Sequence, residues 1–123
     1  MAELFTDDGV WEGADGRSMR GIDEIRAAFS QRQTMTRRAS RHAITNVTID
    51  VSTDTKATAL CYLVNYRHDG ADDVVSLPAP ARLPKFVGEY HDQLVRTPAG
   101  WRIVNRFEQT VWMDGELPAA PPG

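Results

Sequence analysis

The fold of this chain is indicated first by Arg41-His42-Ala43-Ile44-Thr45-Asn46-Val47-Thr48-Ile49-Asp50-Val51. Polar and apolar residues alternate here, which is typical of a β-strand with one buried face. A second run, Ala57 to His68, is rich in β-branched and aromatic residues, and segment 52–56 has the length and composition of a hairpin loop. We therefore predict two long antiparallel strands, with His42 at the start of the first.

A helix and a second hairpin flank this pair. Gly21 opens a segment with apolar residues at helical spacing. They are Ile22, Ile25 and Phe29. Phe86 to Arg96 and Trp101 to Val111 predict two more strands around the turn sequence 97–100. One helix before about four long antiparallel strands predicts an α+β domain, with the helix packed on a curved sheet.

The ends of the chain have their own patterns. Leu4 and Phe5 are typical of the last turn of a helix, and a short extended segment follows at Val10 to Glu12. Prolines exclude segment 77–84 from a central strand. We expect one domain over residues 1–112, followed by a proline-rich C-terminal tail over 113–123.

Composition narrows the classes of function. The 123 residues are 41% hydrophobic and 25% charged, with a net charge of -3, which suits one globular domain and disfavours nonspecific nucleic-acid binding. The longest apolar run, Ala59 to Val64, is far shorter than the ~20 residues of a membrane span. No secretory signal is evident, so we expect a cytoplasmic protein without nucleic-acid or membrane partners. Cys61, the single cysteine, is expected to be buried.

Four segments in order resemble one family. They are Leu4-Phe5-Thr6-Asp7-Asp8-Gly9-Val10-Trp11-Glu12, the glycine-opened helix to Phe29, Arg41 to Asn46, and Gly88-Glu89-Tyr90-His91-Asp92 leading to Gly100-Trp101-Arg102-Ile103. Together they resemble the SnoaL-like branch of the nuclear transport factor 2-like superfamily, which includes polyketide cyclases, scytalone dehydratase and related isomerases. The resemblance implies a cone-shaped α+β fold, a mostly apolar pocket for a small organic molecule, and a homodimer formed through the sheet.

The resemblance also implies a role for His42. It matches the histidine that acts as general acid and base in dehydratase members, where an aspartate on the first helix orients the imidazole. That helix would precede Leu4, so we expect the helix and its aspartate to be absent here. A longer natural chain is the alternative. The aspartate of ketosteroid isomerases falls near Gly13, and Glu12 beside it would point to the opposite face of a strand.

Two further residues are catalytic candidates. If Tyr90 and Asp92 face the pocket, Asp92 is the best remaining residue to orient His42; a surface carboxylate beside Arg96 or Arg102 is the alternative. Arg106 matches a cavity arginine of some dehydratases and is suited to hold a carboxylate or an oxyanion. A cross-strand surface ion pair with Glu89 or Asp92 is the alternative for Arg106.

Several aromatic and polar residues are candidates for contact with the ligand. They are Trp11, Tyr62, Tyr66, Tyr90 and Asn46. Core packing is the alternative for the aromatic residues, and a strand-edge hydrogen bond is the alternative for Asn46. We expect His91 on the outer face of the sheet or at an interface.

These residues favour a small lyase or isomerase that abstracts a proton from an apolar ring or carbonyl compound. The three histidines lack zinc-ligand spacing, and no phosphate-binding glycine loop or dinucleotide motif is present, so neither a metal nor a cofactor is implied. The alternative is a non-catalytic module of the same fold that binds a small ligand or dimerises.

Overall fold

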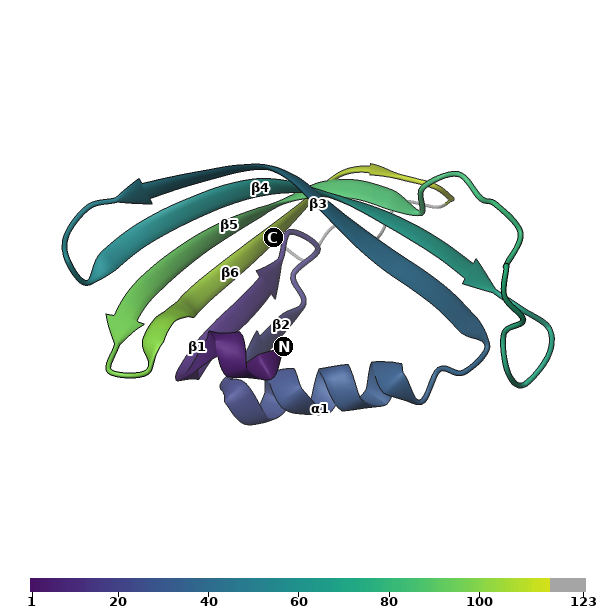
Figure 1. Ribbon diagram of the computed structural model, residues 1–123, viewed down its shortest axis with the longest axis horizontal. Helices are drawn as coiled ribbons and strands as arrows, with labels where there is room; N and C mark the ends of the chain where they lie inside the picture. Colours follow the sequence, from purple (N-terminus) through teal and green to yellow (C-terminus); the bar gives the residue numbers. More distant parts are fainter. Residues whose placement is uncertain (116–123) are drawn as a thin grey trace.

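The computed structural model describes residues 1–115. Its elements are η1 (Ala2–Leu4), β1 (Phe5–Gly13), β2 (Ser18–Arg20), α1 (Ile22–Gln33), β3 (Arg38–Val51), β4 (Lys56–Asp69), β5 (Phe86–Thr97) and β6 (Gly100–Met113). The strands form one sheet in the order β2-β1-β6-β5-β4-β3 (Figure 1). Every neighbouring pair is antiparallel except β1 and β6, which run parallel.

The predicted helix and both predicted hairpins are present, and most of their bounds extend slightly beyond the prediction. At the N-terminus, Leu4 ends a 3-10 turn, but Phe5 already belongs to β1, where it is buried and pairs with Ile103. This corrects the predicted helical turn at Phe5. Strand β2 was not predicted because three residues are too few to show a periodic pattern. Most of the predicted tail, residues 116–123, lies outside the described residues.

The start of α1 follows from its sequence. Gly21 has φ 86°, a backbone conformation that favours glycine, and it leads the chain from β2 into the helix. Asp23 and Glu24 lie in the first turn, where the helix dipole favours carboxylates. The Glu24 carboxylate also accepts a hydrogen bond from the Arg20 backbone N–H at 2.7 Å. No helix in residues 1–115 is both long and apolar enough to cross a membrane.

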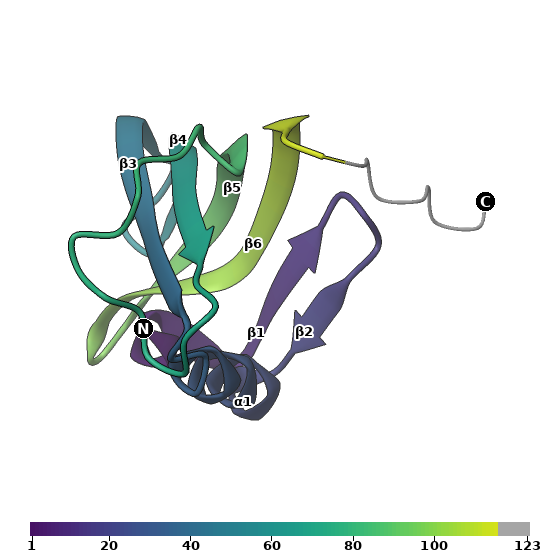
Figure 2. The same cartoon turned by 90° about the vertical axis from the view of Figure 1, so that its right-hand side faces the viewer.

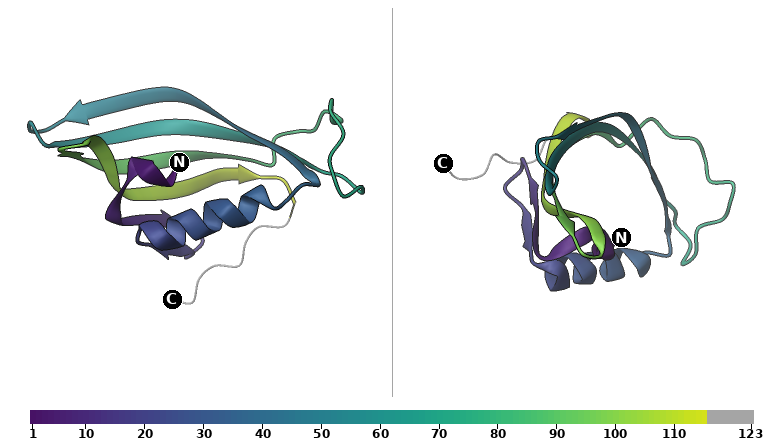
Figure 3. Two further views of the ribbon diagram at one scale, coloured as in Figure 1. Left: turned by 60° about the horizontal axis from the view of Figure 1, so that its bottom comes forward. Right: turned by 60° about the vertical axis from the view of Figure 1, so that its left-hand side comes forward.

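The sheet is strongly curved, and α1 lies along its concave side (Figures 2 and 3). The helix packs mainly on η1, β1 and β2. The core lies between these elements and the concave faces of β4, β5 and β6. Its buried members are Ala2, Phe5, Trp11, Ile25, Cys61, Leu63, Tyr90 and Ile103. Cys61 is thus buried, as predicted.

Strand β3 lies at the edge of the sheet, and all of its residues from 41 to 51 are exposed. Its register with β4 shifts between Thr45 and Thr48, where Asn46 has φ 55°. Asparagine tolerates this left-handed conformation better than most residues, which suits it to a β-bulge. Because a bulge inserts an extra residue, Ile44 before it and Ile49 after it both lie opposite concave-face positions of β4.

Candidate functional site

An aromatic cluster around Trp11 fills the concave side of the sheet near α1. The Trp11 ring stacks on Phe5 with centroids 6.0 Å apart, and it meets Phe29 at 5.7 Å and Tyr90 at 5.8 Å. Trp11 and Tyr90 are buried, so the two residues belong to the core. Both were predicted to contact a ligand, with core packing as the alternative; the structure places them on the concave face, packed in the core.

Glu108 adds a carboxyl group to this cluster. Its Oε2 accepts a hydrogen bond from Trp11 Nε1 at 3.2 Å. Burial raises the pKa of the Glu108 carboxyl, while the Trp11 hydrogen bond and the charge of Arg32 act in the opposite direction. Sequence reasoning missed Glu108. The alternation of β6 held the signal, since Glu108 lies two residues beyond Arg106 and therefore on the same face.

Asp92 and Arg106 form an ion pair beside the aromatic cluster. Arg106 Nε and Nη2 each donate to a different oxygen of Asp92 at 2.8 Å, and the side chains are only 8% and 13% exposed. The Arg106 guanidinium also lies 4.1 Å from the Tyr90 ring centroid. The proposed orientation of His42 by Asp92 is thus corrected, because both Asp92 oxygens bind Arg106. The ion-pair alternative is the observed one, but it is buried and not at the surface.

Tyr90 is the second titratable group whose chemistry the cluster changes. Burial raises the pKa of its hydroxyl to about 12, with the nearby Glu108 charge acting in the same direction and Arg106 against it. Tyr90 is therefore neutral at physiological pH, and it is suited to donate a hydrogen bond rather than to remove a proton.

His42 lies on the concave face of β3. It pairs with Asn65 of β4, which in turn pairs with Phe86 of β5, and the imidazole meets the Phe86 ring at 6.0 Å. Burial by these neighbours, followed by the charge of Arg32, lowers the pKa of His42, although the residue as a whole is exposed. The imidazole is therefore mainly neutral at pH 7. Within residues 1–115, no carboxylate lies within hydrogen-bond distance of it.

Arg32, in the last turn of α1, is the charged residue that affects both His42 and Glu108. Its guanidinium carbon is 5.8 Å from the Trp11 ring centroid and 5.5 Å from that of Phe29. No carboxylate of the described part of the chain forms a salt bridge with it. Its charge acts on the pKa values of both His42 and Glu108. Sequence reasoning missed Arg32, since a charged residue near a helix end is ordinary.

Two of the other three predicted ligand contacts lie away from the concave face. Tyr62 and Tyr66 are on the outer face, 44% and 47% exposed, because they alternate with the buried Cys61, Leu63 and Asn65. Asn46 lies in the β-bulge of β3, where its positive φ explains why an asparagine occupies this position. For Tyr62 and Tyr66 the structure corrects the prediction of a place in the concave site, whereas the ligand contact of Asn46 stays a prediction.

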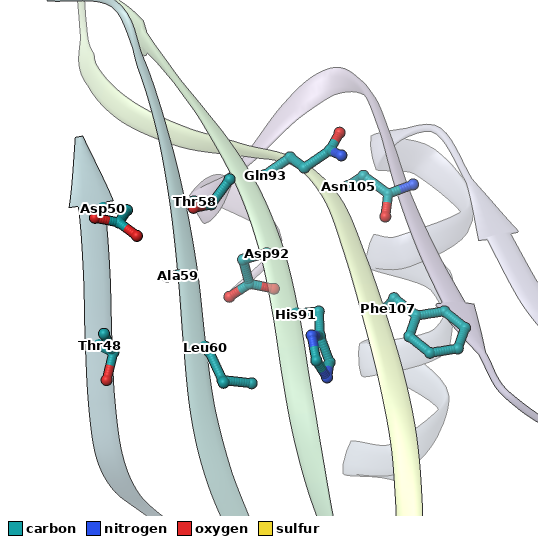
Figure 4. Close-up of a pocket in the computed structure, with 10 residues that line it drawn as sticks. All are labelled: Thr48, Asp50, Thr58, Ala59, Leu60, His91, Asp92, Gln93, Asn105 and Phe107. Atoms are coloured by element: carbon teal, nitrogen blue, oxygen red, sulfur yellow. The ribbon is translucent and has the colours of Figure 1, made fainter. Parts of the chain in front are cut away.

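Two surface hollows lie away from His42 and Glu108. One, of about 390 Å³, is on the outer face, where Leu60, His91 and Phe107 lie in register on neighbouring strands (Figure 4). His91 is thus on the outer face, as predicted. The other hollow, of about 350 Å³, is lined by Arg67, Ala81, Arg82, Leu83, Lys85 and Asp114. Among residues 1–115, no three His, Cys, Asp or Glu side chains are grouped to hold a metal ion.

Known structures share this architecture. A scytalone dehydratase-like protein from Novosphingobium aromaticivorans is 22% identical in sequence to this chain, with a TM-score of 0.74. The match covers 98% of this chain and 76% of the Novosphingobium chain. ActVI-ORFA from Streptomyces coelicolor is 19% identical with a TM-score of 0.70, covering 89% and 78%. A Catenulispora acidiphila protein in complex with S-DNPA is 21% identical with a TM-score of 0.67, covering 89% and 75%.

These likenesses show that the predicted fold is correct: a curved, mainly antiparallel sheet with a helix on its concave side, as in nuclear transport factor 2-like proteins. No curated protein sequence matches the chain significantly. The sequence model of the SnoaL-like domain family matches residues 1–107, which is most of the chain. The predicted resemblance is thereby confirmed, and the protein belongs to the SnoaL-like domain family.

Proposed function

We propose that this protein is a cofactor-independent lyase or isomerase that transfers a proton on an apolar ring or carbonyl compound. His42 acts as the base. The observation that carries the proposal is the setting of His42: a neutral imidazole on the concave face, beside the Phe86 ring and near enough to Arg32 to feel its charge. A neutral imidazole accepts a proton from a carbon next to a carbonyl group.

Glu108 is proposed as the second proton-transfer group. A carboxyl group whose pKa is raised by burial is suited to donate a proton to an oxygen of the substrate. Strand β6, which carries Glu108, and strand β3, which carries His42, lie on opposite sides of the concavity (Figure 3). A bound ring would therefore have the base on one side and the acid on the other.

Arg106 is proposed to act through Tyr90 rather than on the substrate directly. Asp92 accepts from two of its nitrogens, and the guanidinium lies on the Tyr90 ring. This arrangement fixes the ring, so that its neutral hydroxyl is held on the concave face. Asp92 and Arg106 are then positioning residues.

Support for the reaction class also comes from the similar structures. The Novosphingobium protein is named for scytalone dehydratase, and ActVI-ORFA and the Catenulispora complex have the same fold with comparable coverage. At about 20% identity these names do not transfer as activities. They indicate that substrates should be sought among those of dehydratases and related enzymes.

Hydrogen exchange tests the proposal before a natural substrate is known. An enolisable ring ketone, 2-tetralone, is incubated in D2O, and loss of its α-hydrogen signals is followed by NMR. We expect the protein to accelerate exchange, and His42→Asn to lower the rate by about 100-fold, which is a typical contribution of a general base. His68→Asn, a histidine beside Arg82 and outside the concave cluster, is the matched control and should leave the rate unchanged.

The alternative is a non-catalytic module that binds a small apolar ligand. The observation in its favour is that His42 has no carboxylate partner within residues 1–115. It predicts that 2-tetralone binds, as seen in the NMR signals of Trp11, without any exchange above that of buffer. Exchange that survives in His42→Asn would instead remove His42 from the mechanism.

A homodimer through the outer face is also part of the proposal. Tyr62 and Tyr66 expose almost half of their surface there, beside a hollow that neighbouring strands form. We expect Tyr62→Glu to produce monomers in sedimentation analysis, whereas Ile49→Glu, on the β3 edge, should not. A wild-type protein that is monomeric at micromolar concentration would rule the dimer out.

A further inference from the structure

Within residues 1–115, one exposed cation beside the concave aromatic cluster, Arg32, has no counter-charge. Three charged side chains meet the aromatic cluster: Arg106, Glu108 and Arg32. Arg106 is neutralised by Asp92, at two distances of 2.8 Å. Within the described residues, the Arg32 guanidinium forms neither a salt bridge nor a side-chain hydrogen bond.

Within the described residues, Glu108 forms no salt bridge with Arg32. The two groups are near enough for the charge of Arg32 to act on the pKa of Glu108, but burial still raises that pKa overall. Glu108 is instead bonded to Trp11 Nε1. Arg32 is an exposed residue, so its guanidinium is accessible to an anion from outside the chain.

The position of Arg32 is held by packing. Its guanidinium carbon lies within 6 Å of the ring centroids of Trp11 and Phe29, a distance typical of cation–π contacts. These rings fix the side chain without using its N–H donors. The donors are consequently left for a ligand, and a planar guanidinium matches the two oxygens of a carboxylate.

We propose that Arg32 binds the carboxylate of a ring compound whose apolar part lies against the concave aromatic residues between His42 and Glu108. This inference rests on the concave site of the proposed function and names its ligand class: an unsaturated or aromatic ring that carries a carboxylate. Helix α1 runs along the concave side, and residues 34–37 connect it to β3 (Figure 1). The charge of Arg32 in its last turn acts on the pKa values of both His42 and Glu108.

A matched pair of ligands tests the charge. Calorimetric titration compares 2-naphthoate with its methyl ester, which has the same ring and no charge. Because a charge-assisted hydrogen bond favours the acid, we expect it to bind about ten- to a hundredfold more tightly than the ester. Equal affinities, or no binding of 2-naphthoate at millimolar concentration, would overturn the inference.

A matched pair of variants tests the residue. Arg32→Gln should abolish the preference for the acid and leave the affinity for the ester within about twofold of wild type, since the rings remain. Arg26→Gln is the control, because Arg26 is exposed on the same helix and pairs with Asp23 at 3.6 Å. A preference that persists in Arg32→Gln, or that is lost equally in Arg26→Gln, would contradict the assignment.

One readout needs no ligand. The charge of Arg32 contributes to the lowered pKa of His42, so Arg32→Gln should raise the pKa of His42 in an NMR titration, whereas Arg26→Gln should not. An unchanged pKa of His42 would show that Arg32 is not near the site. Failure of the two proposals is distinguishable: acid-selective binding through Arg32 without any proton exchange would refute the enzyme and retain the carboxylate site.

Discussion

Strands β6 and β3 contribute to the same concave face, but their surroundings differ. Strand β1 and its Trp11 pack against β6, so that Arg106 and Glu108 are largely buried. Arg106 donates hydrogen bonds to Asp92, and Glu108 accepts one from Trp11. Along β3, every residue from 41 to 51 is exposed, including Ile44, Ile49 and Val51. The two candidate proton-transfer groups thus lie in unlike settings, with Glu108 on the packed side and His42 on the open side.

The difference shows what covers the sheet. Helix α1 packs mainly on η1, β1 and β2, at the packed side. Burial there changes the pKa of Tyr90 and of Glu108 mainly through desolvation, an effect that weakens with exposure. On the open side, apolar side chains of β3 face the concavity with little protein against them. Such apolar surface often marks a ligand or an interface.

The largest expected effect separates a buried ion pair from an exposed one. Arg106→Met should lower the free energy of unfolding by about 3–5 kcal/mol, because Asp92 is left buried without a partner. Arg38→Met, which removes the exposed β3 pair with Asp69, should cost less than about 1 kcal/mol. Urea denaturation measures both. Adding Asp92→Leu to Arg106→Met should recover much of the loss; no recovery would show that packing, and not charge, dominates.

The next comparison concerns apolar packing. Leu63→Ala removes a side chain that is 0% exposed and should cost about 2–5 kcal/mol. Ile49→Ala, at a β3 residue that is 61% exposed, should change stability by no more than about 0.5 kcal/mol. The same denaturation experiment applies. A loss of several kcal/mol in Ile49→Ala would mean that the open side is covered in solution, for example by a second copy.

A smaller effect is expected at the β-bulge. Alanine tolerates φ 55° less well than asparagine, because it has no short polar side chain to form a local hydrogen bond. Asn46→Ala should therefore lower the free energy of unfolding by about 1 kcal/mol. Asn46→Gly should be nearly neutral, because glycine adopts positive φ readily. Thermal unfolding compares the two variants. If the two variants lose the same stability, the Asn46 side chain itself, and not its backbone conformation, contributes to folding.

The smallest expected effect is a pH dependence on the packed side. Folding raises the pKa of Glu108 above its usual 4.5, so the ionised carboxylate disfavours the fold. Glu108→Gln should therefore be more stable than wild type at pH 7. The advantage should vanish below about pH 4.5, where the group is protonated in both states. A constant difference between pH 4 and 7 would show that ionisation of Glu108 does not affect stability.

Much of the fold was predictable from local pattern. Alternation over Arg41 to Val51 and Ala57 to His68, with turn residues between them, gives the hairpin and its orientation because successive side chains of a strand face opposite ways. The same reasoning placed Tyr90 and Asp92 on one face and His91 on the other. It did not settle which face is concave for Tyr62 and Tyr66, because that depends on how the sheet curves around α1.

The site was less predictable because it depends on contacts between distant segments. Trp11 and Glu108 are 97 residues apart along the chain. They meet because β1 pairs with β6 as a parallel strand. Arg32 lies in a helix and joins the site only through the packing of α1 on the aromatic rings.

By itself the sequence determined the α+β class, the hairpins, the family and the position of His42 on a strand, since these follow from periodicity and motif order. The tertiary structure decided the partners: Asp92 binds Arg106 and not His42, and Glu108 is held by Trp11. The physical reason is that periodicity fixes the face on which a side chain lies, whereas hydrogen bonding and desolvation depend on the elements that pack across that face.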